Sequence, residues 1–161
     1  GMGCPSTAIA VEELARVGVT SFIRVGSSAG LQPGIAPGDL LVSEGSFRND
    51  GTTDAYLPKG FPAVPDLELT LALARHSERI AAASGTHSFR GISVSDDAFY
   101  AETPEWIAEL NRMGILNVEM EASALYIVDG ASLYDEKNSA LKDGWMRSIE
   151  AALDTAVELE L

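Results

Sequence analysis

The sequence predicts an α/β fold in which a largely parallel sheet carries helices on both of its faces. The main observation is an alternation along the chain. Short apolar segments are followed by longer segments in which apolar residues recur every three or four positions, as in strands separated by helices. The length of 161 residues suits one domain, and 46% hydrophobic and 22% charged residues are ordinary for a globular protein. This composition argues against disorder, a collagen-like structure and a disulfide scaffold.

The first half of the chain is predicted to alternate between regular elements and loops, with glycine or proline at the boundaries. A residue able to cap a helix precedes the first helix, and a glycine follows it. The expected segments are a helix from Ser6 or Thr7 to about Val17 with Gly18 after it, a short and mostly buried strand over Thr20–Val25, a small-residue loop over 26–30, a strand over Asp39–Ser43 and a long loop over Phe47–Pro65.

The second half continues the alternation, again with capping residues and glycines at helix ends. The expected segments are a helix capped by Asp66 and ending near Ser84, a strand over Phe89–Ser95, a helix capped by Thr103 and stopped by Gly114, a strand over Ile115–Val118, a helix over Glu121–Val128 and a last helix from about Ser139 to Leu159. One feature departs from the α/β pattern. No apolar strand stands between the helix that begins at Glu121 and the last helix.

The net charge disfavours two classes of partner, and the cysteine content indicates the compartment. The net charge is −13, from 11 basic and 24 acidic residues, which disfavours binding to nucleic acids or anionic membranes. The single cysteine, Cys4, cannot form an internal disulfide and indicates a reducing compartment. Neither a signal peptide nor an apolar run long enough to span a bilayer is visible. We therefore expect a cytoplasmic protein.

The segment Phe22–Ser28 carries the strongest local signal for chemistry. Arg24 lies near the end of an apolar segment, where a buried guanidinium is costly unless it meets an anion. Small and hydroxylated residues follow, so backbone amides and the Ser27 hydroxyl could converge on a phosphate together with Arg24. The alternative is that Arg24 pairs with an internal carboxylate and the serines only turn the chain. The loop has neither the Walker spacing nor the dinucleotide fingerprint.

The segment Glu119–Glu121 is the second signal. It follows a predicted strand, and residues two apart in an extended segment point to the same side. Two carboxylates on one side can accept hydrogen bonds from a vicinal diol such as that of ribose, with Met120 as an apolar contact. The alternative is a solvated acidic pair at the start of a helix, where acidic residues are common.

Other candidates are weaker. Phe99 and Tyr100 follow a predicted strand, where an aromatic ring can stack on a planar base, although a core aromatic is the alternative. His76 and His87 are expected on the surface. Cys4 has no adjacent base, and the spacing of a metal site is absent, so we expect no metal.

In this order the motifs resemble those of the nucleoside phosphorylase superfamily, which contains uridine phosphorylase and the hexameric purine nucleoside phosphorylases. The resemblance covers about Gly1–Val128, and Arg-Val-Gly followed later by Glu-Met-Glu is its most specific part. The matching stretches are Gly1–Ser6, Ile23–Ser28, Phe61–Asp66, Ser95–Tyr100 and Val118–Ala122.

The resemblance implies a three-layer α/β/α fold of the phosphorylase/hydrolase-like type, with a mixed and mostly parallel central sheet. It implies a pentosyltransferase that uses phosphate to cleave the N-glycosidic bond of a nucleoside, yielding the free base and ribose 1-phosphate. Inorganic phosphate would be the co-substrate and no cofactor would be needed. A homo-oligomer, a dimer or a hexamer, is expected on the same grounds.

The roles implied by the resemblance fall on residues that match the family motifs. Arg24, Glu121 and Asp129 are the catalytic residues implied, with Asp129 the counterpart of an aspartate that acts as general acid on the base in the purine branch. The binding residues implied are Arg24, Gly26 and Ser27 for phosphate, Glu119, Met120 and Glu121 for ribose, and Phe99 for the base.

The motifs do not decide which base the substrate carries, because they are similar to two branches of the family. Phe47–Gly51 and Phe61–Val64 are similar to the uridine branch, which we favour. The positions where that branch reads uracil hold Thr103 and Glu105, and Glu105 cannot replace an arginine donor. Phe99–Glu102 is similar to archaeal purine and methylthioadenosine phosphorylases. A hydrolytic nucleosidase is a further alternative, although water needs no guanidinium. A non-catalytic ligand-binding or assembly protein is another.

The sequence departs from the family pattern at two places. A single domain over residues 1–161 is expected, without the family's N-terminal segment and without a stretch near residues 128–129. The N-terminal segment of the family holds a Gly-rich phosphate loop with an arginine and a histidine that reaches a neighbouring subunit's ribose. The departures leave two alternatives open: the sequence is part of a longer protein, or it is a truncated relative that need not be catalytic.

Overall fold

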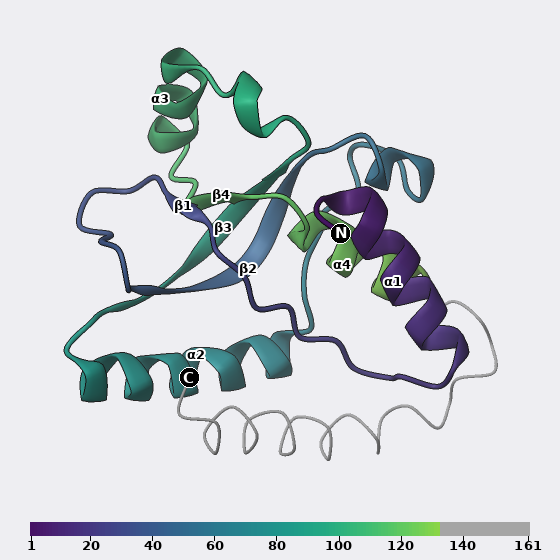
Figure 1. Ribbon diagram of the computed structural model, residues 1–161, viewed down its shortest axis with the longest axis horizontal. Coiled ribbons are helices and arrows are strands. Elements are labelled where there is room, and N and C mark those ends of the chain that lie inside the picture. Colours follow the sequence, from purple (N-terminus) through teal and green to yellow (C-terminus); the bar gives the residue numbers. More distant parts are fainter. Residues whose placement is uncertain (133–161) are drawn as a thin grey trace.

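A computed structural model of the chain describes residues 1–132, without the side chains of residues 129–132 (Figure 1). The predicted helix over Ser139–Leu159 lies outside the described residues. The elements in chain order are α1 (Cys4–Arg16), β1 (Ala29–Gly30), β2 (Leu40–Asn49), the 3-10 helix η1 (Thr53–Ala55), α2 (Leu67–Ser84), β3 (Ser88–Asp96), the 3-10 helix η2 (Phe99–Ala101), α3 (Pro104–Arg112), β4 (Asn117–Glu119) and α4 (Ala122–Ser132).

The four strands of the described residues form one sheet in the order β1-β4-β3-β2. Strands β2, β3 and β4 are parallel, and β1 pairs antiparallel with β4. The predicted mixed, mostly parallel sheet is therefore confirmed. The carboxyl ends of the parallel strands meet at one edge, where Asn49 pairs with Asp96 and Ser95 with Glu119. Ligands of α/β proteins usually bind at such an edge.

Helix α3 covers one face of the sheet. Val94 and Val118 pack with Leu110 of α3 and with Ile115, and all four side chains are at most 5% exposed. The apolar side of α3 supplies the contact, since partly buried Trp106 and Ile107 also pack there.

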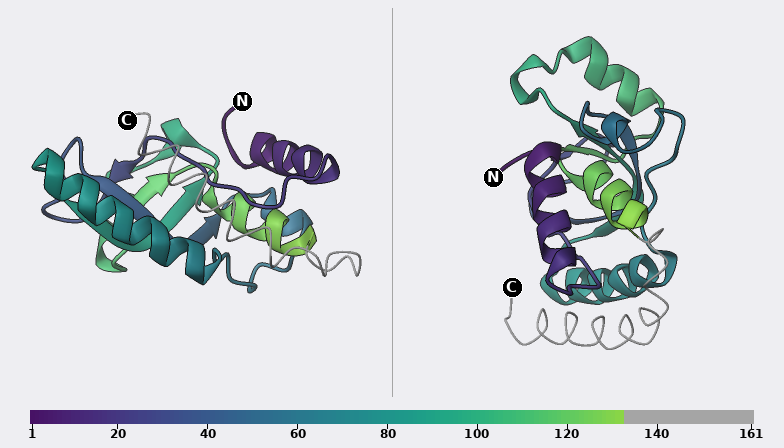
Figure 2. Two further views of the ribbon diagram at one scale, coloured as in Figure 1. Left: turned by 90° about the horizontal axis from the view of Figure 1, so that it is seen from below. Right: turned by 90° about the vertical axis from the view of Figure 1, so that its right-hand side faces the viewer.

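The opposite face of the sheet meets α2 and α4 (Figure 2). Ser95 on β3 accepts a hydrogen bond from the backbone amide of Ser123 on α4 at 2.8 Å. Helix α1 covers α4 through Ala8, Val11 and Val128, each at most 3% exposed. With α3 on the other side, these helices complete the predicted three-layer α/β/α arrangement.

The helix boundaries at caps agree with the sequence. The Asp66 carboxylate accepts the amide of Leu69 at 2.8 Å, and Thr103 accepts that of Trp106 at 3.3 Å. Gly85 follows α2 with φ 70°, and Gly114 follows α3 with φ 78°. Each of these capping residues affects only the backbone within a few positions of itself. The helix boundaries can therefore be predicted from the local sequence.

The start of α1 corrects the prediction of a cap at Ser6 or Thr7. The helix begins at Cys4, and Gly3 is the capping residue with φ 87°. Pro5 fits the first helical turn because it lacks an amide that would be unpaired there. The hydroxyls of Ser6 and Thr7 donate instead to the Gly3 carbonyl, at 3.0 and 3.2 Å.

The prediction of a buried strand over Thr20–Val25 is wrong. These residues have no regular structure, and the side chain of Val25 is 92% exposed. The apolar, β-branched sequence gives a preference for extended backbone, but a strand also needs a neighbour with which to pair. No strand within residues 1–132 pairs with this segment.

The predicted loop over Phe47–Pro65 also begins too early, because β2 continues to Asn49. The Arg48 side chain, 4% exposed, organises the loop that follows. Its Nη1 donates to the carbonyls of Pro58 and Phe61 at 2.7 and 2.8 Å, and its Nη2 donates to that of Leu57 at 2.8 Å. One guanidinium thus joins three backbone carbonyls of a loop that has little regular structure of its own.

Asp39 ties the starts of β2 and β3 together. Its carboxylate accepts the amides of Ala36 and His87, at 2.8 and 2.9 Å. These hydrogen bonds favour the charged form, and the His87 ring lies 3.4 Å away, so the pKa of Asp39 is below its ordinary value.

We expect Asp39 to stabilise the fold at neutral pH and to lose this effect in acid. Because the folded-state pKa is lowered, the stabilisation is present above the ordinary aspartate pKa of about 3.9 and is lost as the pH falls through the lowered value. Urea unfolding of the parent and of Asp39→Asn should give a difference in unfolding free energy that shrinks below about pH 4. An equal difference at pH 7 and in acid would contradict this role.

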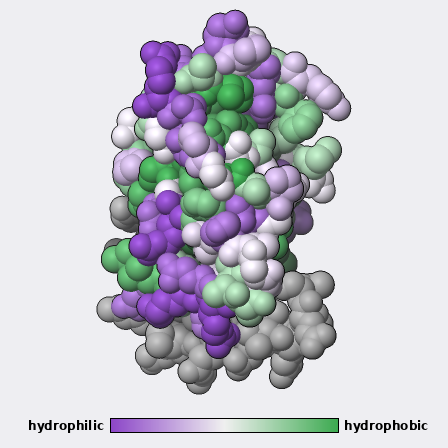
Figure 3. Space-filling view, turned by 90° about the vertical axis from the view of Figure 1, so that its left-hand side faces the viewer, coloured by the Kyte–Doolittle hydropathy of each residue, from purple (hydrophilic) through white to green (hydrophobic). Residues whose placement is uncertain are grey.

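The described surface carries scattered apolar side chains. On the face in Figure 3, hydrophobic residues form small groups between hydrophilic ones, as is ordinary for protein surfaces. Across residues 1–132, we find no helix with the length and apolar character needed to cross a bilayer.

Candidate active site

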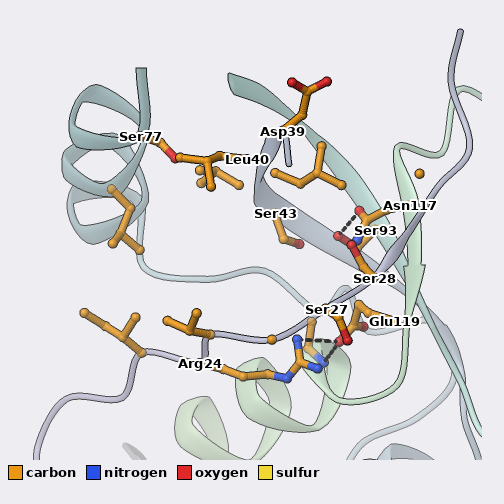
Figure 4. A pocket seen from close by; sticks show the side chains of 18 of the residues that line it. Arg24, Ser27, Ser28, Asp39, Leu40, Ser43, Ser77, Ser93, Asn117 and Glu119 are labelled. Atoms are coloured by element: carbon orange, nitrogen blue, oxygen red, sulfur yellow. Dashed lines mark hydrogen bonds and ion pairs between the residues drawn. The ribbon is translucent and has the colours of Figure 1, made fainter. Parts of the chain in front are cut away.

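A cavity of about 780 Å³ opens between the segment 22–30, β2, α2 and α4. Three of the predicted phosphate and ribose residues that line it are Arg24, Ser27 and Glu119. Figure 4 shows these three side chains close together at one end of the cavity, and Asp39 and Ser77 at the other. Among the described residues that line the cavity, Arg24 is the single basic one.

The Arg24 guanidinium meets both predicted carboxylates. Its Nη1 lies 3.4 Å from Glu119 Oε2, and its Nη2 donates to Glu121 Oε2. Arg24 meets an anion, as its position in the sequence requires. In the structure this anion is an internal carboxylate pair, which was the alternative to a bound phosphate. The side chain nevertheless keeps 29% of its surface exposed, and a guanidinium has five N–H donors. Donors therefore remain for an anion in the cavity.

The Glu119 carboxylate is almost fully enclosed. Oε1 accepts the Ser95 hydroxyl, and Oε2 accepts the amides of Glu121 and Ala122, both at 2.8 Å. Glu119 is 5% exposed, and its two amide contacts occupy donors at the start of α4. A carboxylate suits this place because it pairs free amides and the positive end of the helix dipole.

Glu121 joins the N-terminal turn to Arg24. Its Oε1 accepts the amide of Gly3 at 2.7 Å, and its Oε2 accepts Nη2 of Arg24. The carbonyl of Met120 accepts the Cys4 thiol at 3.2 Å. Within the described residues, neither Met120 nor Glu121 is among those lining the cavity. Glu121 therefore reaches the site through its contact with Arg24.

Phe99 stands apart from this cluster, and the position of the Asp129 side chain is not described. Phe99 is 60% exposed and does not line the described cavity, so the alternative of a core aromatic is wrong. Its ring lies edge-on to that of Tyr100, with centroids 5.1 Å apart. Asp129 belongs to the backbone of α4, and its side chain lies outside the described residues.

Tyr126 is a cavity residue that we did not predict. It lines the cavity from α4, burial raises the pKa of its hydroxyl, and a hydrogen bond to Ser43 partly offsets this effect. Ala122 and Leu125 line the same cavity. The spacing of these three positions is that of one helix face, so the stripe following Glu121 was the signal that could have identified Tyr126.

The Cys4 thiol is buried against the start of α4. It is fully enclosed and lies 3.3 Å from the Ser123 hydroxyl. Desolvation raises the pKa of this thiol to about 12, so it stays protonated at neutral pH.

We therefore expect Cys4 not to react with a thiol-specific chromogenic reagent in the folded protein at pH 8. The nucleophile in such reactions is the thiolate, and the folded chain offers neither thiolate nor access. The same reagent should titrate one thiol in concentrated urea. Rapid and complete reaction of the folded protein would contradict the burial of Cys4.

Comparisons with known proteins agree with this arrangement of motifs. Residues 1–128 match the phosphorylase superfamily. The chain is 40% identical over 147 residues to a uridine phosphorylase of Thermococcus kodakarensis, an alignment that covers 83% of this chain and 51% of that protein. It is 39% identical over 139 residues to a uridine phosphorylase of Escherichia coli, covering 78% of this chain and 53% of that protein.

A purine-directed relative is similar to the same degree. The chain is 40% identical over 126 residues to a guanosine phosphorylase of Halorubrum lacusprofundi, covering 78% of this chain and 51% of that protein. The chain thus spans about half the length of the curated relatives it matches. The match over residues 1–128 includes Arg24 and the Glu119–Glu121 segment, and the chain belongs to the phosphorylase superfamily.

Proposed function

We propose that the chain catalyses the phosphate-dependent cleavage of the N-glycosidic bond of a nucleoside, which yields the free base and ribose 1-phosphate. Uridine is the favoured nucleoside. The position of Arg24 is the main support for this proposal. Its partly exposed guanidinium faces the cavity beside Ser27 and is held by Glu119 and Glu121. A planar fork of donors oriented in this way matches the oxygens of a phosphate.

In the proposed reaction, Arg24 and the Ser27 hydroxyl hold inorganic phosphate, and Gly26 lets the backbone approach. A phosphate oxygen attacks the anomeric carbon while the bond from that carbon to the base nitrogen breaks. The bonding electrons leave with the base, and the sugar is oxocarbenium-like in the transition state. The protein contributes by positioning the two reactants and by charge. No covalent enzyme intermediate is required.

The proposal assigns the sugar to the acidic pair. Glu121 accepts hydrogen bonds from the ribose hydroxyls, and because it lies against Arg24, the anomeric carbon is brought near the phosphate. Glu119 and Met120 belong to the same ribose subsite. Phe99 remains the proposed contact to the base, and Asp129 the proposed general acid.

The base is proposed from the relatives. Two of them bear the name uridine phosphorylase, which supports uridine as the favoured substrate. The similarity to a guanosine phosphorylase supports a purine nucleoside as the second candidate. Hydrolysis by water is disfavoured because water, unlike phosphate, is not an anion that the Arg24 guanidinium could bind.

The test is release of free base from uridine, guanosine and methylthioadenosine by the purified chain, with and without phosphate. We expect base and ribose 1-phosphate from uridine only when phosphate is present. Equal rates without phosphate would favour a hydrolytic nucleosidase. Nucleoside binding by calorimetry without turnover would favour a non-catalytic role and overturn the proposal.

Gly26→Ala tests the phosphate position without changing a charged group. A Cβ atom at Gly26 would lie 2.8 Å from Arg24 Nη2, so the flexible guanidinium would have to move. We expect a loss of about tenfold to a hundredfold in kcat/KM, the usual effect of a displaced catalytic group, with an unchanged melting temperature. Gly60→Ala, where a Cβ meets nothing within 4 Å, is the control. Equal activity of the two variants would contradict the position proposed for phosphate.

The location and assembly of the protein complete the proposal. A cytoplasmic location is supported by the single cysteine, Cys4, which is buried as a thiol. A homo-oligomer, a dimer or a hexamer, is supported by the family resemblance. Light scattering of the purified chain tests the assembly, and a monomer at micromolar concentration would contradict it.

A further inference from the structure

Ser95 is the centre of a buried hydrogen-bond network beneath the candidate site. It lies on β3, is fully enclosed, and donates its hydroxyl to Glu119 Oε1. The same oxygen accepts the amide of Ser123 at 2.8 Å and lies 2.8 Å from the Ser46 hydroxyl. The three contacts come from α4, β2 and β4, so Ser95 joins three elements that converge on the site.

The chemistry of a hydroxyl fixes the direction of each hydrogen bond. Ser95 has one hydrogen and two lone pairs. An ionised Glu119 can only accept, so the hydrogen of Ser95 points to it. Ser46 must then donate to Ser95, and the Ser123 amide takes the remaining lone pair. Every hydrogen-bonding capacity of Ser95 is used, and the Glu119 carboxylate has one favoured orientation.

That orientation determines where Arg24 lies. Glu119 Oε2 is 3.4 Å from Arg24 Nη1, and the two α4 amides already hold this oxygen. Turning the carboxylate would withdraw Oε2 from the guanidinium. Because Oε1 is held by a hydroxyl rather than a charge, Ser95 is the contact that can be removed without adding or deleting charge at the site.

We propose that Ser95 is a positioning residue for phosphate binding: it orients Glu119, and Glu119 orients the Arg24 guanidinium. This inference rests on the proposed function and adds to it a residue with no direct contact to substrate. It also gives Glu119 the role of holding Arg24 in addition to its proposed place at the ribose.

The network continues away from the site, which provides a control for a merely structural role. The Ser123 hydroxyl donates to the buried Asp50 at 2.6 Å, whereas the Ser123 amide contacts Ser95. Ser123→Ala therefore breaks the outer network but leaves the orientation of Glu119. Ser88→Ala is a second control on the same strand, since the enclosed Ser88 hydroxyl has no partner in the described structure.

The experiment compares Ser95→Ala with Ser123→Ala and Ser88→Ala in the full chain. We expect Ser95→Ala to raise the KM for inorganic phosphate about tenfold while kcat changes less than about threefold, because a ground-state contact is loosened. Ser123→Ala should lower the melting temperature and keep the parent KM, and Ser88→Ala should change neither. An unchanged KM in folded Ser95→Ala, or the same KM increase in Ser123→Ala, would overturn the proposal.

A second measurement does not depend on turnover. The Nε resonance of Arg24, assigned by its loss in Arg24→Lys, should shift in Ser95→Ala and stay in place in Ser88→Ala. If Ser95→Ala does not fold, Ser95→Cys keeps a similar shape with a weaker donor, and the same shift is expected. An unmoved resonance overturns the positioning role. Absence of turnover in the parent chain, with a resonance that shifts, overturns the proposed function alone.

Discussion

Arg24→Ala should lower kcat/KM for phosphate-dependent uridine cleavage by about a hundredfold to a thousandfold, the scale of effect seen when one positioned hydrogen-bond donor is removed from an active site. The reason is that Arg24 is the single basic residue among the described residues lining the cavity. Arg24→Lys should recover only part of the activity, because an ammonium keeps the charge but loses the planar fork. Steady-state kinetics with phosphate varied at saturating nucleoside is the measurement.

The control separates the local effect of Arg24 from a general effect of charge. Arg75→Ala removes an exposed arginine from α2 and leaves the cavity untouched, so we expect parent kinetics. Arg24→Ala also leaves Glu119 and Glu121 without their cation, which makes circular dichroism and a melting curve necessary. A folded Arg24→Ala protein with the parent KM for phosphate would contradict the assignment of phosphate to this residue.

Arg48→Ala should destabilise the protein by about 1–3 kcal/mol, the range found when hydrogen-bond acceptors lose their donor. The guanidinium is 4% exposed and donates to the carbonyls of Leu57, Pro58 and Phe61 and to the Thr53 hydroxyl. Truncation leaves these acceptors without their donor. Since whole domains are stable by only about 5–15 kcal/mol, a large part of the stability would be lost.

Urea unfolding followed by circular dichroism measures this effect. Arg48→Lys should also be destabilised, because one ammonium lacks the planar fork of donors that contacts all of these acceptors at once. Arg90→Ala is the matched control on β3. Its side chain is 42% exposed and lies 3.6 Å from Glu44, so a change below about 1 kcal/mol is expected. Equal stabilities of Arg48→Ala and Arg90→Ala would show that Arg48 does not hold the loop.

The parts of the fold that were predictable depend on local physics. Asp66 and Thr103 accept amides three residues ahead of them, and Gly85 and Gly114 adopt left-handed conformations at helix ends. Such features are visible in a short window of sequence. The strand predicted over Thr20–Val25 failed for the opposite reason. Its composition is that of a strand, but pairing depends on residues far away in the chain, which composition does not report.

The residues of the candidate site also divide into those that could be predicted from the sequence and those that could not. Arg24 and Glu119 were predictable because each has an unusual charge beside an apolar segment, and the structure brings them to 3.4 Å. The contact of Glu121 with the Gly3 amide, 118 residues away, has no local signature. Ser95 and Tyr126 were missed because a buried serine and a helical tyrosine look ordinary until the elements around them are assembled.

A crystal structure of the chain with inorganic phosphate would show directly whether Arg24 binds the anion. We expect phosphate density in the cavity, with oxygens within about 3 Å of the Arg24 guanidinium and the Ser27 hydroxyl, and with Glu119 still bonded to Ser95. Phosphate bound elsewhere, with the guanidinium still engaged only by Glu119 and Glu121, would contradict the role of Arg24.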